Sequence, residues 1–203
     1  MSRDLVLEFV TACREGGVVP FFYHTLVDWH NHDYVNDFDR YIDYLVSSVE
    51  ILCTNYGEIG GLWFDGTWDK PADTNWQFDR LYSTIRKYQP NAMIINNTGV
   101  LDLGSVGHPE IDSVTFERGK PVRVSTDRPL AGEMCMPLHD HWGFAKHDYN
   151  YQNMSHYFRT ILNSRLAGAN LLLNVGPMSR GRVKTIDQGI SADIRIVRFD
   201  LED

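Results

Sequence analysis

One aspartate, Asp65, has the surroundings of a group that could do chemistry. It follows a short apolar run, residues 60–64, and Gly66 leaves the space beside it open. Trp63 and Trp68 bring aromatic surface within its reach. At the carboxyl end of a buried parallel strand, such a carboxylate lies on the edge where α/β barrels hold their catalytic groups. The sequence therefore predicts a functional Asp65, and the alternative is an aspartate that caps the following turn.

Two segments rich in histidine and aspartate offer a different chemistry, a divalent metal site. Their members are Asp28, His30, His32 and Asp33 in the first segment, and His139, Asp140, His141, His147 and Asp148 in the second. Neither segment has the i, i+4 helical spacing of a zinc protease. Polar histidines in loops are mostly solvated, so we expect no metal and no other cofactor.

The overall composition excludes some classes of partner. The chain has 203 residues, 43% of them hydrophobic, and a formal net charge of -8. No basic stripe is available to bind nucleic acid or an anionic membrane surface. No apolar run approaches the roughly 18 residues of a membrane span. One globular domain is expected, and the aromatic content of 12% suits a protein that stacks flat apolar faces against a ligand.

The three cysteines, Cys13, Cys53 and Cys135, are far apart and form no CxxC pair. This pattern predicts neither a disulfide framework nor a zinc site. The first residues also lack the basic segment followed by an apolar segment that is typical of a secretory signal peptide. These two observations predict a cytoplasmic protein.

Helical and extended patterns alternate along the chain. The expected helices cover residues 4–15, 38–52, 76–88 and 157–166, and the expected strands cover residues 18–23, 60–64, 92–96, 113–117, 131–136 and 170–175. Apolar strands that alternate with amphipathic helices indicate parallel βα units. We assign residues 1–182 to a catalytic domain of this type, and residues 183–203 to a C-terminal tail without assigned structure.

The number of units is too small for a closed barrel. A (β/α)8 barrel typically needs about 250 residues, and this sequence starts with a helix that has no strand before it. The predicted fold is therefore an incomplete (β/α)8-type, TIM-like barrel, with the later strands present and the first strands missing from this chain. An uncovered edge strand tends to pair with a strand from another chain. We therefore expect an oligomer or a complementing N-terminal chain.

Four short motifs resemble motifs of the α-L-fucosidases of glycoside hydrolase family 29 and occur in the same order as in that family. The similarity runs from about residue 3 to residue 182. The motifs are WFDG at residues 63–66, IINN at 94–97, GEMC at 132–135 with DHWGF at 140–144, and NLLLNVGP at 170–177. The resemblance implies a (β/α)8-like catalytic domain, a retaining mechanism, no metal, and a substrate with a terminal α-L-fucosyl group on a glycoconjugate.

The resemblance also implies roles for individual residues. Asp65 matches the nucleophile, since a retaining glycosidase needs an ionised carboxylate at the anomeric carbon. Trp63 shares a side of the strand with Asp65 by alternation and would press on the sugar. Glu117 is the expected acid/base, with Glu133 as the alternative, and the expected separation from Asp65 is about 5–5.5 Å. Glu110 and Asp112 are rivals in the same region.

Three further residues are expected to bind substrate. His24 follows an apolar strand where relatives hold a sugar hydroxyl, although a buried structural histidine is the alternative. Trp142 is the expected wall for the fucose methyl group, and Glu133 lies in a family motif at a strand end. The family's N-terminal sugar-binding motifs have no match in this chain. Two functions therefore stay open: a fucosidase that another chain completes, or an inactive half-barrel that binds sugar or a subunit.

Overall fold

The computed structural model describes residues 3–97, 103–124, 128 and 130–196. The chain forms two compact units, residues 1–115 and residues 116–203. Residues 98–102, 125–127 and 129 lie outside the described residues. Each unit is built from βα segments, as the alternating sequence pattern predicts.

The first unit contains four parallel strands that are hydrogen-bonded in chain order. They are β1 (Phe21–Thr25), β2 (Gly61–Asp65), β3 (Met93–Asn96) and β4 (Ser113–Thr115). The register pairs Tyr23 with Trp63 and Thr25 with Asp65. Because parallel strands share their carboxyl edge, the residues that end β1, β2 and β3 lie at one edge of this sheet.

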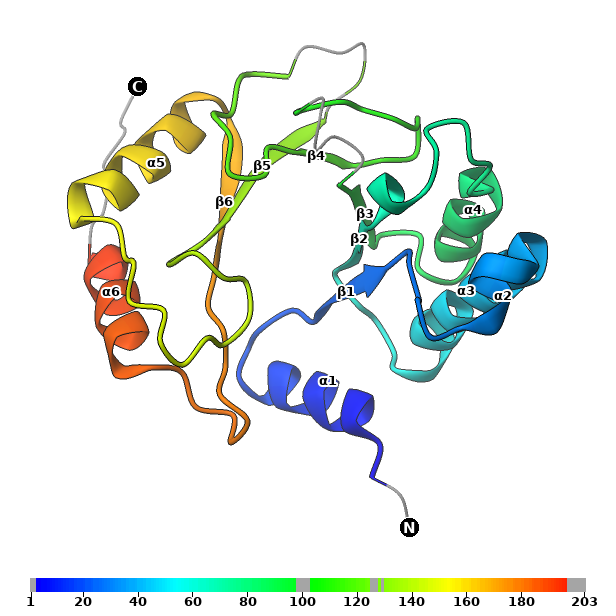
Figure 1. Cartoon of the computed structure of the whole chain (residues 1–203), viewed down its shortest axis with the longest axis horizontal. Coiled ribbons are helices and arrows are strands. Elements are labelled where there is room, and N and C mark those ends of the chain that lie inside the picture. Colours follow the sequence, from blue (N-terminus) through cyan, green and yellow to red (C-terminus); the bar gives the residue numbers. More distant parts are fainter. Residues whose placement is uncertain (1–2, 98–102, 125–127, 129, 197–203) are drawn as a thin grey trace. The chain divides into compact units, whose positions relative to one another are not determined.

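Helices α3 (Phe38–Asn55) and α4 (Phe78–Tyr88) contact each other and pack on one face of these strands (Figure 1). The core that they form with the sheet includes Ile42, Leu45, Val49, Leu62, Phe64, Leu81, Ile85 and Ile94. The buried positions of α3 repeat at three- and four-residue intervals, as its amphipathic sequence predicts. A short helix, α2 (His32–Asn36), precedes α3 and was not predicted.

The first helix, α1 (Leu5–Glu15), differs from the prediction in what it buries. The N-cap of this helix is Asp4, whose side chain accepts a hydrogen bond from the Leu7 amide at 3.0 Å. The apolar residues expected to face the core are largely exposed, however, with Leu5 at 67% and Phe9 at 46%. Amphipathic spacing predicts that a helix has an apolar face, but only the tertiary structure determines what covers that face.

The second unit contains the parallel pair β5 (Ala131–Pro137) and β6 (Ala169–Asn174), with helices α5 (Met154–Leu166) and α6 (Thr185–Ile196). Helix α5 contacts both β6 and α6. The segment assigned as a tail without structure therefore includes a helix. Gly168, in the left-handed conformation with φ of 70°, separates α5 from β6 at the predicted position.

Glycines allow β2 to pack closely against its neighbours β1 and β3 and then to turn. A Cβ at Gly60 would lie 2.1 Å from the Phe21 ring, and a Cβ at Gly61 would lie 2.5 Å from the Met93 carbonyl oxygen. Gly66 has φ of 115°, a conformation that L side chains rarely adopt. The strand can therefore end at Asp65 and turn at once into the short 3-10 helix η1 (Thr67–Asp69).

Among the described residues, no helix is both long and apolar enough to cross a lipid bilayer. The three cysteines are free thiols; Cys53 and Cys135 are buried and Cys13 is partly buried. Burial raises the pKa of the Cys53 thiol to about 11, which keeps it protonated and unreactive at neutral pH.

Candidate active site

Asp65 is the last residue of β2, and three hydrogen-bond donors converge on its carboxylate. The Tyr23 hydroxyl donates to Oδ2 at 2.9 Å. The Gly66 amide donates to Oδ1 at 2.9 Å, and the Asn97 side-chain amide approaches the same oxygen at 3.4 Å. Donors from β1, from the residue after β3 and from the turn after β2 therefore fix the orientation of one carboxylate at the carboxyl edge of the sheet.

The Asp65 carboxylate shares its face of the sheet with two aromatic rings. Tyr23 stacks on Trp63, with ring centroids 5.5 Å apart and an interplanar angle of 21°. Tyr23 also contacts Asp65, so Trp63 and Asp65 lie on the same face, as strand alternation predicts. The opposite face, with Leu62 and Phe64 at 0% exposure, is buried under the helices.

Asn97 is a buried link between Asp65 and β4. Its side chain is 0% exposed, and its Oδ1 atom accepts a hydrogen bond from the Thr115 hydroxyl at 2.8 Å. This bond holds the Asn97 amide so that its nitrogen is directed at Asp65. Asn97 belongs to the IINN motif at residues 94–97, and the sequence predicts no separate role for it. Its place directly after a predicted strand, like that of Asp65, was the available signal.

His24 does not share the face of Asp65. Its ring packs 5.9 Å from Phe64, and its Nε2 atom is 2.8 Å from the Ser48 hydroxyl on α3. Burial lowers the pKa of His24. The prediction that His24 binds a sugar hydroxyl is therefore corrected, and the alternative, a structural histidine between β1 and α3, agrees with the contacts.

The two rival acids in the first unit are held in an ion-pair network. Arg86 on α4 donates from Nε to Glu110 at 2.9 Å and from Nη2 to Asp112 at 2.7 Å. Asp112 Oδ2 also accepts a hydrogen bond from the amide of Ile94, the second residue of β3, at 2.7 Å. Asp112 therefore links α4 to β3, and Glu110 is paired with the same guanidinium of Arg86.

In the second unit, Glu117 and Arg118 come directly after the buried Phe116. Arg118 is exposed, and its guanidinium donates to the Asp140 carbonyl at 2.7 Å and lies 5.3 Å from the centre of the Trp142 ring. A guanidinium over an indole is a favourable cation–π arrangement. The structure thus joins the Glu117 segment to the loop that carries Trp142, whose side chain is partly exposed.

Glu133 lies within β5 and is nearly buried, at 7% exposure. It is paired in register with Asn170 of β6, and the Asn170 side-chain amide donates to Glu133 Oε2 at 3.0 Å. Neighbouring strands therefore orient this carboxylate. Glu133 and Glu117 both remain predicted acid/base residues.

The second histidine segment folds around Asp148. The Nδ1 atoms of His139 and His141 lie 2.9 Å and 2.6 Å from Asp148 Oδ2, which also accepts hydrogen bonds from the amides of Asp140 and His141. The hydrogen bond from His141 is the main cause that holds the pKa of Asp148 far below its usual range. Because nitrogen donors already surround this oxygen, the cluster resembles a loop clamp more than a metal site.

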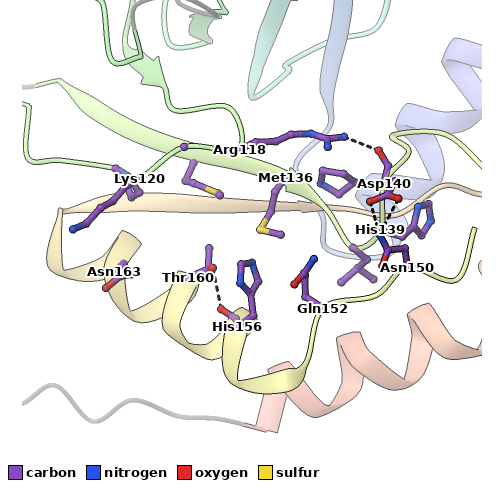
Figure 2. A pocket seen from close by; sticks show the side chains of 15 residues that line it. Arg118, Lys120, Met136, His139, Asp140, Asn150, Gln152, His156, Thr160 and Asn163 are labelled. Atoms are coloured by element: carbon purple, nitrogen blue, oxygen red, sulfur yellow. Dashed lines mark hydrogen bonds between the residues drawn. The ribbon is translucent and has the colours of Figure 1, made fainter.

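A cavity of about 470 Å³ lies beside this clamp, within the second unit. Figure 2 shows Met136 on its strand side and His156, Thr160 and Asn163 of α5 on the other side. Arg118, Asp140 and Asn150 lie at one end, and Lys120 at the other. The cavity is therefore lined about equally by polar and apolar surface, and the apolar part includes two buried methionines, Met134 and Met136.

The family model and the curated relatives that match this chain belong to the same family. The model of the alpha-L-fucosidase family matches residues 1–194. Alpha-L-fucosidase 1 of Arabidopsis thaliana is 33% identical over 138 residues, which cover 68% of this chain and 23% of the relative. The alpha-L-fucosidase of Branchiostoma floridae is 24% identical over 91% of this chain and 42% of the relative. The chain therefore spans less than half the length of these curated relatives.

Solved structures show the same similarity at the level of the fold. Alpha-L-fucosidase isoenzyme 1 from Paenibacillus thiaminolyticus superposes with a TM-score of 0.80 at 30% identity, over 95% of this chain and 51% of that chain. A putative alpha-L-fucosidase from Bacteroides thetaiotaomicron gives a TM-score of 0.79 at 22% identity, over 94% of this chain and 46% of that chain. The family match, the curated relatives and the shared parallel α/β fold agree: this chain belongs to the alpha-L-fucosidase family.

Proposed function

We propose that this chain carries the catalytic nucleophile of a retaining α-L-fucosidase that releases terminal fucosyl groups from glycoconjugates. The observation that carries the proposal is the Asp65 carboxylate at the end of β2, oriented by the Tyr23 hydroxyl, the Gly66 amide and the Asn97 side chain. A carboxylate that must attack one carbon atom in line with a leaving oxygen needs such fixed orientation. Membership of the fucosidase family supplies the substrate class.

The proposed reaction has two displacements. In the first, an Asp65 oxygen bonds to the anomeric carbon while the bond to the aglycone oxygen breaks, and the acid/base gives its proton to that oxygen. In the second, water attacks the same carbon, the acid/base takes a proton from the water, and the bond to Asp65 breaks. Glu117 is the proposed acid/base and Glu133 the alternative.

The aromatic rings beside Asp65 fit this role. Trp63 offers an apolar surface on the face that holds the carboxylate, and Tyr23 stacks against it. Trp142 is the proposed wall for the fucose methyl group. A solved relative, AlfC from Lactobacillus casei, has been crystallised with α-L-fucose and, as its D200A variant, with Fuca(1,6)GlcNAc, so fucosylated N-acetylglucosamine is a reasonable test substrate here.

The edge of the first unit supports a second part of the proposal, that another segment or subunit completes the site. Apolar side chains near the start of β1 are exposed, including Val19 at 64% and Phe21 at 40%. Apolar surface beside a strand edge favours association with another strand or helix. We therefore propose that the active assembly contains a complementing chain or a second copy, and native mass spectrometry of the active species tests this.

The central experiment is hydrolysis of 4-nitrophenyl α-L-fucoside by the protein and by its Asp65→Asn variant. Asp43→Asn is the matched control, because Asp43 is exposed and forms a surface ion pair with Arg80. Release of nitrophenol by the protein and the control, with its loss in Asp65→Asn, supports the proposal. A 2-fluoro-fucosyl reagent should label the peptide that contains Asp65, and a label elsewhere would refute the assignment.

The alternative function is an inactive module that binds sugar or a subunit. The exposed apolar residues of α1 and β1 are the observation that favours it, because they suit an association surface. Binding of fucose without release of nitrophenol, at the concentration where the protein is assembled, would support this alternative over the enzyme.

A further inference from the structure

Two exposed tryptophans, Trp29 and Trp68, lie together beyond the carboxyl ends of β1 and β2. Their side chains are 65% and 56% exposed, yet their ring centroids are only 6.4 Å apart at an interplanar angle of 62°. Single exposed aromatic residues are common, whereas contiguous exposed apolar surface is a feature of binding sites. Neither ring belongs to the three groups that donate to the Asp65 carboxylate in the described part of the chain.

The Trp29 ring is held in place by Asp69. Its Nε1–H donates to Asp69 Oδ2 at 3.1 Å, and the hydroxyl of the buried Tyr34 donates to the same oxygen at 2.6 Å. Lys70 lies 4.1 Å from the centre of the Tyr34 ring and donates to the Tyr34 carbonyl. This network orders an exposed ring before any ligand arrives, so binding there would cost less conformational entropy.

The chemistry that the pair offers is apolar and flat. Because the indole N–H of Trp29 is already bonded to Asp69, this ring presents a ligand mainly with its π surface and its edges. A pyranose ring has a matching flat patch of C–H groups surrounded by hydroxyls. An edge-to-face pair of indoles can contact such a ring while its hydroxyls stay in water.

The position of the pair connects it to the reaction. Trp68 follows Asp65 by three residues, through the turn at Gly66 into η1, and Asp69 belongs to the same short helix. We propose that Trp29 and Trp68 form an aglycone platform, which binds the sugar to which the fucosyl group is attached. This inference rests on the proposed function of Asp65 and deepens it: the preferred substrates are fucosylated oligosaccharides, not simple fucosides.

The test compares two substrates in Trp29→Ala, Trp68→Ala and the double variant. One is Fuca(1,6)GlcNAc, which has a sugar aglycone, and the other is α-L-fucosyl fluoride, which has none. Loss of one aromatic contact is expected to reduce the ratio of kcat/KM for disaccharide to fluoride by about 3- to 10-fold. The double variant should lose more, and the change should appear mainly in KM. Tyr44→Ala, which removes an exposed ring from α3, is the control and should leave the ratio unchanged.

Asp69→Ala adds a test of the anchor. This variant keeps both indoles but removes the hydrogen bond that orients the Trp29 ring. It should therefore raise KM for the disaccharide by a smaller factor than Trp29→Ala does, and leave kcat unchanged. An unchanged ratio in the double variant would overturn the platform. Equal losses on both substrates would overturn it too, because they would show that the rings support the fold or the fucosyl site.

Binding measurements separate failure of the platform from failure of the proposed function. If the protein hydrolyses neither substrate, the proposed function fails, and the platform is judged by saturation-transfer NMR with Fuca(1,6)GlcNAc. Transfer to the N-acetylglucosamine protons that disappears in the double variant supports the platform without catalysis. Transfer that persists in the double variant overturns it.

Discussion

Removing one hydroxyl group, in Tyr23→Phe, tests the idea that neighbouring strands orient the Asp65 carboxylate. The change deletes the donor that lies 2.9 Å from Asp65 Oδ2 and keeps the ring that stacks on Trp63. A hydrogen bond to a charged group contributes about 1.5–3 kcal/mol, and we take the lower end because Tyr23 is exposed. If this energy is lost from the transition state, kcat/KM should fall about 10-fold.

The assay is the steady-state hydrolysis of 4-nitrophenyl α-L-fucoside, with thermal unfolding measured on the same samples. Tyr44→Phe is the matched control, because Tyr44 is an exposed tyrosine on α3. We expect both variants to keep the parental melting temperature and only Tyr23→Phe to lose activity. An unchanged kcat/KM in Tyr23→Phe would refute the argument, and so would a loss of activity that accompanies an equal loss in Tyr44→Phe.

Three further predictions concern the groups that support the two units. Asp112→Asn weakens the partly buried ion pair with Arg86 and should lower the free energy of unfolding by about 2 kcal/mol in urea titrations, whereas a surface ion-pair change should cost well under half of this. The folded-state pKa of Asp148 lies below its unfolded value, so the stabilisation from this carboxylate is complete above the unfolded pKa and is lost as the pH falls through the folded pKa. The free energy of unfolding of Asp148→Asn should therefore fall less steeply with decreasing pH than that of the parent protein. An equally steep fall in both proteins would contradict this. Thr115→Val removes the hydroxyl that donates to the Asn97 side chain. The free energy of unfolding should fall by about 1 kcal/mol and kcat/KM should fall severalfold. Thermal melting and steady-state kinetics of the same variant measure the two effects.

The order and type of the main elements could be predicted from local sequence. Repeats at three and four residues predicted α3 and α4, and short apolar runs predicted β2, β3 and β6, because these patterns reflect burial on one face of a helix or within a sheet. The position of Asp65 at a strand end followed from the same pattern and is confirmed. Short elements without a clear period, such as α2, escaped prediction.

The surroundings of Asp65 could be predicted only in part. Trp63 was assigned to its face correctly, because alternation within one strand depends only on local geometry. The sequence predicts a binding role for His24 and none for Tyr23, although they are consecutive residues of β1. The face on which each lies depends on the register between β1 and β2, and nothing in a single strand encodes that register.

The choice among acidic residues shows the same limit. Glu110 and Asp112 were rivals for the acid/base because they lie in a polar segment after β3. Arg86, 24 and 26 residues earlier on α4, pairs with both and gives them a structural role. A partner that is distant in sequence becomes adjacent only when the helix packs on the sheet.

The sequence by itself determined the family, the alternation of strands and helices, and the carboxylate at the end of β2, because these features depend on local patterns and short motifs. Only the tertiary structure decided which groups orient that carboxylate, which histidine is structural, and that Trp29 lies against Trp68. Most of those contacts join residues that are distant in the sequence, such as Tyr23 with Asp65 and Trp29 with Asp69. They depend on strand register and on the packing of loops at a shared edge, and no local pattern in the chain specifies either one.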